Sequence, residues 1–503
     1  MATLTTVIDV EPRDLIHHAG QLLADRHRLA LVAAHHDPAS DGRDGAIRIV
    51  YLFTAGPPDR RTELHVRLDP DRPHVPSLAA LSFPASRFER EMHDLFGVVP
   101  EHHPLPRRLV RHPHWPSGWY PMRRDAGPAP TFSGAEPFPF VTVQGTGVYE
   151  IPVGPVHAGL IEPGHFRFSV VGETILKLKA RLWYVHKGIE KLFENGPAAE
   201  RTALAERISG DTAVGHALAY SLAVEDALGM TVDPEAQRAR AALLELERLH
   251  NHIADIGALC NDVGFGIAHS HAQRIRERLL RLNQQTTGHR LLRGGVFPGG
   301  ARLRRVPEPA EVRAIADDIA EIVRLSLDHT IVQERFTGTS VLTREQAIEI
   351  GTLGYVARAS GLAFDARVAH PFTDLGDLAV PTYDSGDVLA RFLVRADEVQ
   401  ASAALLERLL PTLAPTGPDD GDAPRTLPAP GAPATGTGIV EGWRGAITHR
   451  VEIAPDGTLT RVKVVDPSFF NWPALPVSLA DTIVPDFPLT NKSFNLSYAG
   501  NDL

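Results

Sequence analysis

The stretch Glu162-Pro163-Gly164-His165-Phe166-Arg167 opens the larger of two units in this sequence. Two short strands are expected directly after it, at Phe166–Val170 and Glu173–Lys179, joined by a turn at Gly172. Apolar residues then recur at helical spacing in five long segments. These segments are Asp211–Leu228, Pro234–Leu259, Ala272–Arg290, Pro309–Val332 and Asp387–Leu410. The pattern predicts a mainly helical domain over residues 147–503, with a short sheet at its start.

The sequence before this domain predicts a small α+β domain over residues 1–124. A proline-, glycine- and alanine-rich linker at 125–146 follows it. Residues 102–116 are basic and rich in proline, which is typical of an extended tail. The expected elements are helices at Pro12–Ala24 and near Ser86–Phe96, and strands in LALVAAHH (29–36), IRIVYLFTA (47–55) and TELHVRLDP (62–70). The chain as a whole is therefore expected to have an α+β fold.

Two further features are expected toward the end of the chain. Residues 411–438 are rich in Pro, Ala, Gly and Asp, a composition typical of a disordered insertion. Ala446–Ile453 and Thr458–Val465 flank Asp456-Gly457, and this arrangement predicts a C-terminal β-hairpin.

Composition limits the kind of protein this can be. The formal net charge is −10, which disfavours nucleic acid as a partner. No apolar run approaches the roughly 20 residues that span a bilayer, so we expect a cytosolic chain that reaches a membrane through other subunits. There is one cysteine, Cys260. The chain alone therefore cannot supply the thiolates of an iron–sulfur cluster.

One charged and aromatic segment in the first domain resembles a known signature. Residues 87–97 read Arg-Phe-Glu-Arg-Glu-Met-His-Asp-Leu-Phe-Gly. Taken alone, this is a solvated helix that ends at Gly97. The string resembles the C-type subunit of NADH-quinone oxidoreductase, in which the segment docks neighbouring subunits. The resemblance implies a docking role for this domain.

A nearly continuous set of strings in the second domain resembles the D-type subunit of NADH-quinone oxidoreductase and the large subunit of formate hydrogenlyase-type, energy-converting hydrogenases. The strings are Gly154–His157, Glu162–Arg167, His186–Lys191, Ala219–Glu225, Asp262–Gly264, Arg358–Gly361, Gly386–Arg391, Glu441–Gly445, Arg461–Lys463 and Pro467–Asn471. Both groups contain fusions of C-like and D-like parts. The resemblance implies a peripheral subunit at the cytoplasmic face of the membrane. Its implied partners are an iron–sulfur small subunit and integral membrane antiporter-like and proton-channel-like subunits.

The cysteine count separates this chain from the nickel–iron hydrogenases. Those relatives hold their metals with two CxxC pairs, because low-valent nickel and iron require soft thiolate ligands. The first pair aligns with Ser209 and Thr212, and no cysteine follows Cys260. We therefore expect no nickel–iron centre and no cofactor bound by this chain alone.

In the complex I relatives the vacated cavity receives a quinone, which implies candidate residues here. Asp262 matches the acid that pairs with the family histidine. His165 is the better match for that histidine, because Gly-His is followed shortly by Arg, and His157 is the competitor. An ungapped count places Gly210 or Asp211 where the family has its quinone-binding tyrosine, so the chain departs from the family at this position. Asp211 is either a protonatable group in the cavity or a helix N-cap.

Two further residues are candidates on the same grounds. His216 aligns with a histidine of the hydrogenase-type helix, where it has either a functional or a core role. Arg358 belongs either to a polar axis that couples the cavity to the membrane or to interdomain salt bridges.

The expected function is that of an oxidoreductase subunit that passes electrons from an iron–sulfur partner to a quinone-type acceptor and couples this transfer to ion translocation. The alternative is a non-catalytic scaffold in which Phe494 and Tyr498 fill the cavity. No GxGxxG motif follows an expected strand, so NADH is not expected to bind this chain.

Overall fold

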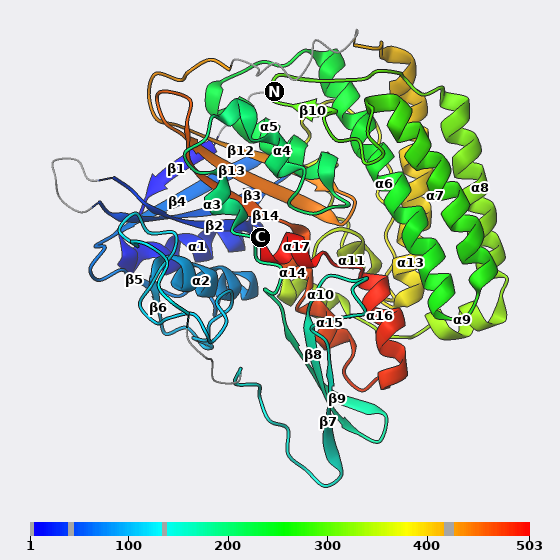
Figure 1. The fold of residues 1–503 in the computed structure, drawn as a ribbon, viewed down its shortest axis with the longest axis horizontal. Coiled ribbons are helices and arrows are strands. Elements are labelled where there is room, and N and C mark those ends of the chain that lie inside the picture. The colour runs from blue at the N-terminus through cyan, green and yellow to red at the C-terminus, as the bar shows by residue number, and fades with distance from the viewer. Residues whose placement is uncertain (1–4, 39–44, 133–137, 417–426) are drawn as a thin grey trace.

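The computed structural model describes residues 5–38, 45–132, 138–416 and 427–503. It contains a mixed sheet and an antiparallel sheet that lie side by side, a layer of long helices and a projecting three-stranded sheet (Figure 1). The expectation of an α+β fold is confirmed.

The first sheet belongs to the N-terminal domain and has the strand order β1-β4-β3-β2. Its strands are β1 (Thr5–Asp9), β2 (Arg28–His36), β3 (Ile47–Ala55) and β4 (Arg60–Leu68). β1 pairs with β4 in parallel, and the other pairs are antiparallel. Two helices, α1 (Leu15–Ala24) and α2 (Phe83–Phe96), accompany it, with the short parallel pair β5 (His74–Pro76) and β6 (Val99–Glu101). α2 ends at Gly97, which has a φ of 77°.

The second sheet lies near the C-terminus and has three antiparallel strands, β12 (Ala434–Gly442), β13 (Gly445–Ile453) and β14 (Leu459–Val465). The predicted hairpin is therefore the β13–β14 part of a larger sheet. The expected insertion at 411–438 is wrong from Ala434 onward, because β12 begins there; residues 417–426 lie outside the described residues.

Two glycines explain why β12 looked like an insertion. Helix α5 (Ala213–Leu228) packs directly on this strand. A Cβ at Gly436 would lie 2.2 Å from the carbonyl oxygen of Ala223, and one at Gly438 would lie 2.0 Å from that of Ala219. Glycine is needed here for close packing of helix on strand, although it is also common in disordered segments.

The long helices form a separate layer, which Figure 1 shows beside the sheets. They are α6 (Pro234–Asp262), α7 (Gly266–Thr287), α8 (Pro309–Leu327) and α13 (Val388–Leu409). The predicted helix Pro309–Val332 is interrupted after Leu327, and α9 (Thr330–Phe336) continues from it. No helix of the described ranges is both long enough and apolar enough to span a bilayer.

Shorter elements complete the second domain. The helices are α3 (Ile189–Phe193), α4 (Thr202–Ala205), α10 (Arg344–Ile350), α11 (Gly354–Ala359), α12 (Ala366–Ala369), α14 (Pro467–Asn471), α15 (Ala474–Ser478), α16 (Phe487–Phe494) and α17 (Tyr498–Asp502), and the strands β10 (Val296–Phe297) and β11 (Gly300–Ala301) form a small hairpin.

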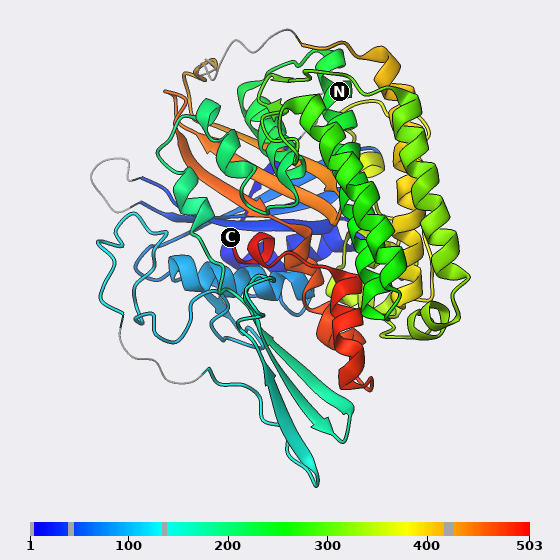
Figure 2. The same ribbon diagram turned by 45° about the vertical axis from the view of Figure 1, so that its right-hand side comes forward.

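A third sheet, β7-β8-β9, projects from the body of the molecule (Figure 2). Its strands are β7 (Val148–Val153), β8 (His165–Val171) and β9 (Thr174–Arg181). The two strands predicted from the sequence are β8 and β9, and β7 adds an antiparallel neighbour. The loop between β7 and β8 contains the Gly154-Pro155-Val156-His157 string.

Buried ion pairs join the first and second sheets. The Arg450 guanidinium donates to both carboxylate oxygens of Glu63, at 2.7 and 3.0 Å. Arg48 donates to both oxygens of Glu452, at 3.0 and 2.9 Å. Although burial opposes its ionisation, the charge of Arg450 and hydrogen bonds lower the pKa of Glu63 to about 2.

We predict that Glu63→Gln weakens this junction. The substitution leaves the buried charge of Arg450 with Glu452 alone, so the free energy of unfolding should fall by about 3 kcal/mol at pH 7. A carboxylate with a lowered pKa stabilises the fold above its ordinary pKa of 4.5 and loses this effect as the pH falls toward about 2. The difference from the wild type should therefore shrink below about pH 4.5, in urea titrations followed by tryptophan fluorescence.

Glu321→Gln, at an exposed position of α8, is the matched control and should unfold like the wild type. A Glu63→Gln variant within about 0.5 kcal/mol of this control at pH 7 would contradict the prediction.

Candidate functional site

A cavity of about 470 Å³ lies between the β7–β8 loop, the segment before α5, the end of α6 and the last two helices. Four residues singled out from the sequence line it: His157, Ser209, Asp211 and Asp262. They come from three segments that are far apart in the sequence. Phe166, Phe487 and Leu496 supply apolar parts of the wall.

The two positions that align with cysteine ligands carry hydroxyls that point to one carboxylate. Ser209 Oγ and Thr212 Oγ1 each donate to Asp211 Oδ1 at 3.0 Å. Arg444 holds the same carboxylate with two hydrogen bonds of 2.7 Å. The charge of Arg444 and these hydrogen bonds outweigh burial and keep the pKa of Asp211 well below its ordinary value. The bidentate contact with Arg444 therefore favours the ionised form of Asp211.

Asp211 was also considered as the N-cap of the helix that follows it, but the structure assigns that position to another residue. The N-cap residue of α5 is Thr212 and not Asp211. The Thr212 side chain makes no capping hydrogen bond, and it is the buried Glu247 carboxyl that caps the helix, accepting from the backbone N–H groups of Val214 and Gly215 at 2.7 and 2.9 Å. Burial raises the pKa of Glu247 to about 8. A second carboxyl group thus lies behind Asp211, on α6.

His157 and Asp262 both face the cavity, but no hydrogen bond within the described residues joins Asp262 to either His157 or His165. His157 Nε2 donates to the carbonyl oxygen of Gly164 at 2.8 Å, which leaves Nδ1 as the acceptor nitrogen. Partial burial raises the pKa of Asp262, and the nearby Lys492 and His269 oppose this shift.

The other three candidates do not line the cavity. His165 Nδ1 donates to the carbonyl oxygen of Gly154 at 3.1 Å. His216 is fully buried between Asp466 and His449, with both contacts at 3.0 Å. Arg358 is fully buried and pairs with Glu398 and Glu441. These side chains therefore hold the loop, the second sheet and the helices in place.

One cavity residue, Arg444, was missing from the candidates, and Tyr498 was named only as a side chain that fills the cavity. Arg444 belongs to the string Glu441–Gly445, so its charge was a usable signal. Tyr498 begins α17, and burial raises its pKa to about 12. A Cβ at Gly164 would lie 2.5 Å from its ring, so the glycine of the Glu-Pro-Gly-His string makes room for this tyrosine. This contact joins residues more than 300 positions apart and could not be read from the sequence.

The chain is similar to known proteins over most of its length. Residues 8–131 match the model of the 30 kDa subunit of respiratory-chain NADH dehydrogenase, and residues 262–435 match that of the 49 kDa subunit. The chain is 33% identical to formate hydrogenlyase subunit 5 of Escherichia coli over 453 residues, or 87% of this chain and 79% of that protein. It is 32% identical to the C/D fusion subunit of NADH-quinone oxidoreductase from Bacteroides thetaiotaomicron, over 70% of this chain and 71% of that protein.

A solved structure is also similar to the fold. A chain of the membrane-bound sulfane sulfur reductase, an archaeal respiratory membrane complex, matches with a TM-score of 0.64 and 27% identity. The match covers 71% of this chain and 98% of that chain. Both the resemblance found in the sequence and the fold are confirmed. This chain belongs to the family of complex I-like oxidoreductase large subunits, in which parts similar to the 30 kDa and 49 kDa subunits are fused in one polypeptide.

Proposed function

We propose that this chain is the peripheral large subunit of a membrane-associated complex and that its 470 Å³ cavity binds a quinone-type electron acceptor. The observation that carries the proposal is the convergence of His157, Asp211, Asp262 and Tyr498 on one cavity with apolar walls. Its volume falls within the range of about 300–1,000 Å³ typical of small-molecule sites. A quinone headgroup is flat and apolar with two polar oxygens, which suits a site of this composition.

We also propose that this chain does not act as a nickel–iron hydrogenase. Serine and threonine hydroxyls occupy the positions of one thiolate pair, and both donate their hydrogens to Asp211. Arg444 adds a fixed positive charge beside them. The one cysteine, Cys260, is buried in α6 and donates to Ser326 Oγ at 3.2 Å. A soft divalent metal would therefore meet hard, already engaged oxygens and a cation.

The residues of the cavity suit the proton side of quinone reduction. Reduction of a quinone to a quinol takes up two electrons and two protons, one at each carbonyl oxygen. Tyr498 stays protonated at neutral pH and can donate a hydrogen bond. The raised pKa of Asp262 favours a second proton-carrying group on the same wall. The Asp211–Arg444 pair, ionised throughout, orients polar groups without exchanging protons.

The electrons in this proposal come from an iron–sulfur cluster in a partner small subunit, and antiporter-like and proton-channel-like membrane subunits use the released energy to move ions. The similar sulfane sulfur reductase is described as a respiratory membrane complex. Next to the cavity, the β7–β8 loop exposes Val156 and Leu160, with exposed fractions of 75% and 89%. Exposed apolar side chains so close to the site suit contact with a membrane subunit at the cytoplasmic face.

The alternative function, a scaffold without a redox ligand, requires a filled cavity. Phe494 is fully buried, and its ring lies 4.4 Å from the Arg391 guanidinium, away from the open space. Tyr498 lines the cavity without closing it. These positions favour the quinone-type function over the scaffold.

The proteins, metals and quinone that purify with the subunit test the proposed function. Affinity purification of the tagged chain from detergent-solubilised membranes should yield an iron–sulfur partner, about one extractable quinone per complex and no nickel. Metal analysis and solvent extraction on the same sample measure this. Bound nickel would contradict the proposal, and a membrane complex without quinone would favour the scaffold or another acceptor such as sulfane sulfur.

The hydroxyl of Tyr498 is tested by a single substitution. Tyr498→Phe keeps the ring but removes the hydroxyl, so quinone reduction by the intact complex should slow by about 10- to 100-fold in kcat, with a smaller change in KM. The assay uses a soluble quinone and a reduced viologen as electron donor. The control is Tyr149→Phe, because Tyr149 lies half-exposed on β7 and its hydroxyl donates to the carbonyl oxygen of Gly172. Equal rates of quinone reduction in the two variants would show that Tyr498 is not a proton donor.

A further inference from the structure

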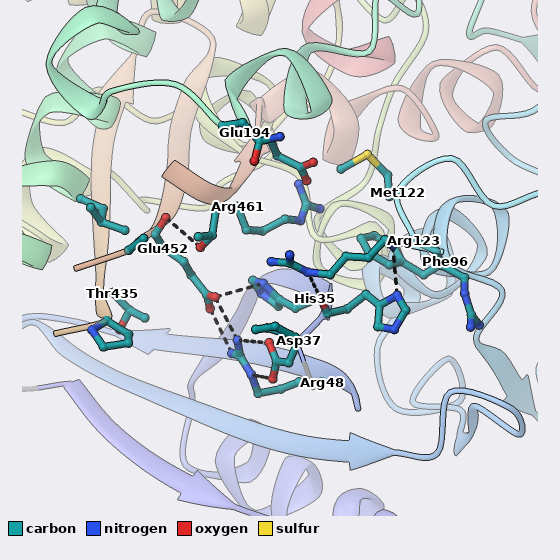
Figure 3. Close-up of a pocket in the computed structure, with 18 of the residues that line it drawn as sticks. His35, Asp37, Arg48, Phe96, Met122, Arg123, Glu194, Thr435, Glu452 and Arg461 are labelled. Atoms are coloured by element: carbon teal, nitrogen blue, oxygen red, sulfur yellow. Dashed lines mark hydrogen bonds and ion pairs between the residues drawn. The ribbon is translucent and has the colours of Figure 1, made fainter. Parts of the chain in front are cut away.

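A second and larger cavity, of about 670 Å³, lies where the first and second sheets meet (Figure 3). Strands β2, β3 and β4 form one wall, and β13 and β14 form the opposite wall. Residues 122–124, which directly precede the linker, and residues from β12 and from α3 and its C-terminal end complete it. This cavity is separate from the 470 Å³ cavity and shares no lining residue with it.

The buried polar side chain of His35 lies in this cavity beside Glu452 and Arg48, as Figure 3 shows. Its exposed fraction is 4%, and neither ring nitrogen has a hydrogen-bond partner among the described residues. Nδ1 is 3.4 Å from a Glu452 oxygen that already accepts from Arg48 at 2.9 Å. Buried polar groups are normally satisfied by protein, water or a ligand. His35 therefore marks a place where a polar ligand would gain a hydrogen bond.

Basic residues outnumber acidic ones on the wall of this cavity. The basic residues are Arg48, Arg67, Arg123, Arg124, Lys191 and Arg461, and the acidic residues are Asp37, Glu194 and Glu452. The lining residues thus carry an excess of positive charge, although the whole chain carries a net charge of −10 and two of the basic residues, Arg123 and Arg461, pair with Asp125 and Glu190 outside the lining. An excess of one sign of charge concentrates ligands of the opposite sign.

Two of these arginines keep donor groups available. Arg48 is fully engaged by Asp37 and Glu452, and Arg461 is engaged by Glu190. Arg67 is exposed and makes one long contact of 3.4 Å with Asp37. Arg124 is exposed and donates through Nε to the carbonyl oxygen of His36, and its terminal nitrogens have no acidic partner among the described residues.

We propose that this cavity binds a small organic polyanion through Arg67 and Arg124 at its mouth and His35 inside. Free guanidinium groups favour ligands with several oxygens, such as phosphate or clustered carboxylate groups. Phe96, Met122 and Ile453 add apolar wall for an organic body. Because both sheets contribute to the wall, the bound anion holds the junction of the two domains together.

The test is isothermal titration of the full chain with ADP, pyrophosphate and citrate at constant ionic strength. We expect one saturable site per chain. Tighter binding of ADP or pyrophosphate than of citrate assigns phosphate chemistry, and the reverse order assigns carboxylate chemistry. Replacing both Arg67 and Arg124 by glutamine should weaken binding by at least about 10-fold, because two charge-assisted contacts are lost.

Two further variants make the result specific. Arg274→Gln with Arg324→Gln changes two exposed arginines on α7 and α8, with the same loss of charge, and should leave binding unchanged. Thr435→Trp fills the cavity from β12 without changing charge and should abolish binding. Absence of saturable binding, equal weakening in the α7–α8 control, or binding that survives Thr435→Trp would each overturn the proposal. Circular dichroism of each variant checks that it is folded.

Discussion

The buried charged layer between β13 and the first sheet is the constraint on which the rest of the structure depends. Arg450 and Glu452 point from β13 toward Glu63 and Arg48, whereas the alternate residues His449 and Val451 point the other way, toward α5. Because side chains alternate along a strand, fixing one face fixes the other. The ion pairs therefore set the position of α5 through β13. The segment Ser209–Asp211, which precedes α5 and lines the 470 Å³ cavity, is positioned with it.

Buried ion pairs of this kind define geometry more than they add stability. Removing a charge from water costs several kcal/mol, and a pair recovers this cost only with good geometry and additional hydrogen bonds. Any shift of one sheet past the other by one residue would leave these charges unpaired. The apolar contact between Phe88 and Phe469, with ring centroids 4.6 Å apart, supplies stabilisation across the same junction but tolerates sliding. The charged layer thus selects one docking of the two domains.

How much could be predicted from the sequence depended on whether the signal was local. Helical periodicity predicted α6 and α13 closely, because their apolar faces recur within one segment. β12 was misassigned, because the need for Gly436 and Gly438 arises from a helix more than 200 residues away. The resemblance placed His157, Ser209 and Asp262 around one cavity, but it favoured His165 over His157 as the family histidine, and His165 does not line that cavity. It named Tyr498 only as a side chain that fills the cavity, because this tyrosine enters from a different segment from the family tyrosine. It could not supply the ionised state of Asp211, because this depends on Arg444.

The charge balance of the cavity bears on the kind of ligand that we propose for it. A metal site with thiolate ligands presents several negative charges to a cation. Here Ser209 and Thr212 are neutral, and the one carboxylate near them is balanced by Arg444. The centre of the cavity therefore carries no net charge in the ionised state of this pair. A neutral acceptor gains hydrogen bonds from such a site without a desolvation penalty for a charge of its own, whereas a cation would be opposed by the guanidinium. The hydroxyls of Ser209 and Thr212 and the guanidinium of Arg444 thus all hold one carboxylate, that of Asp211, beside this cavity.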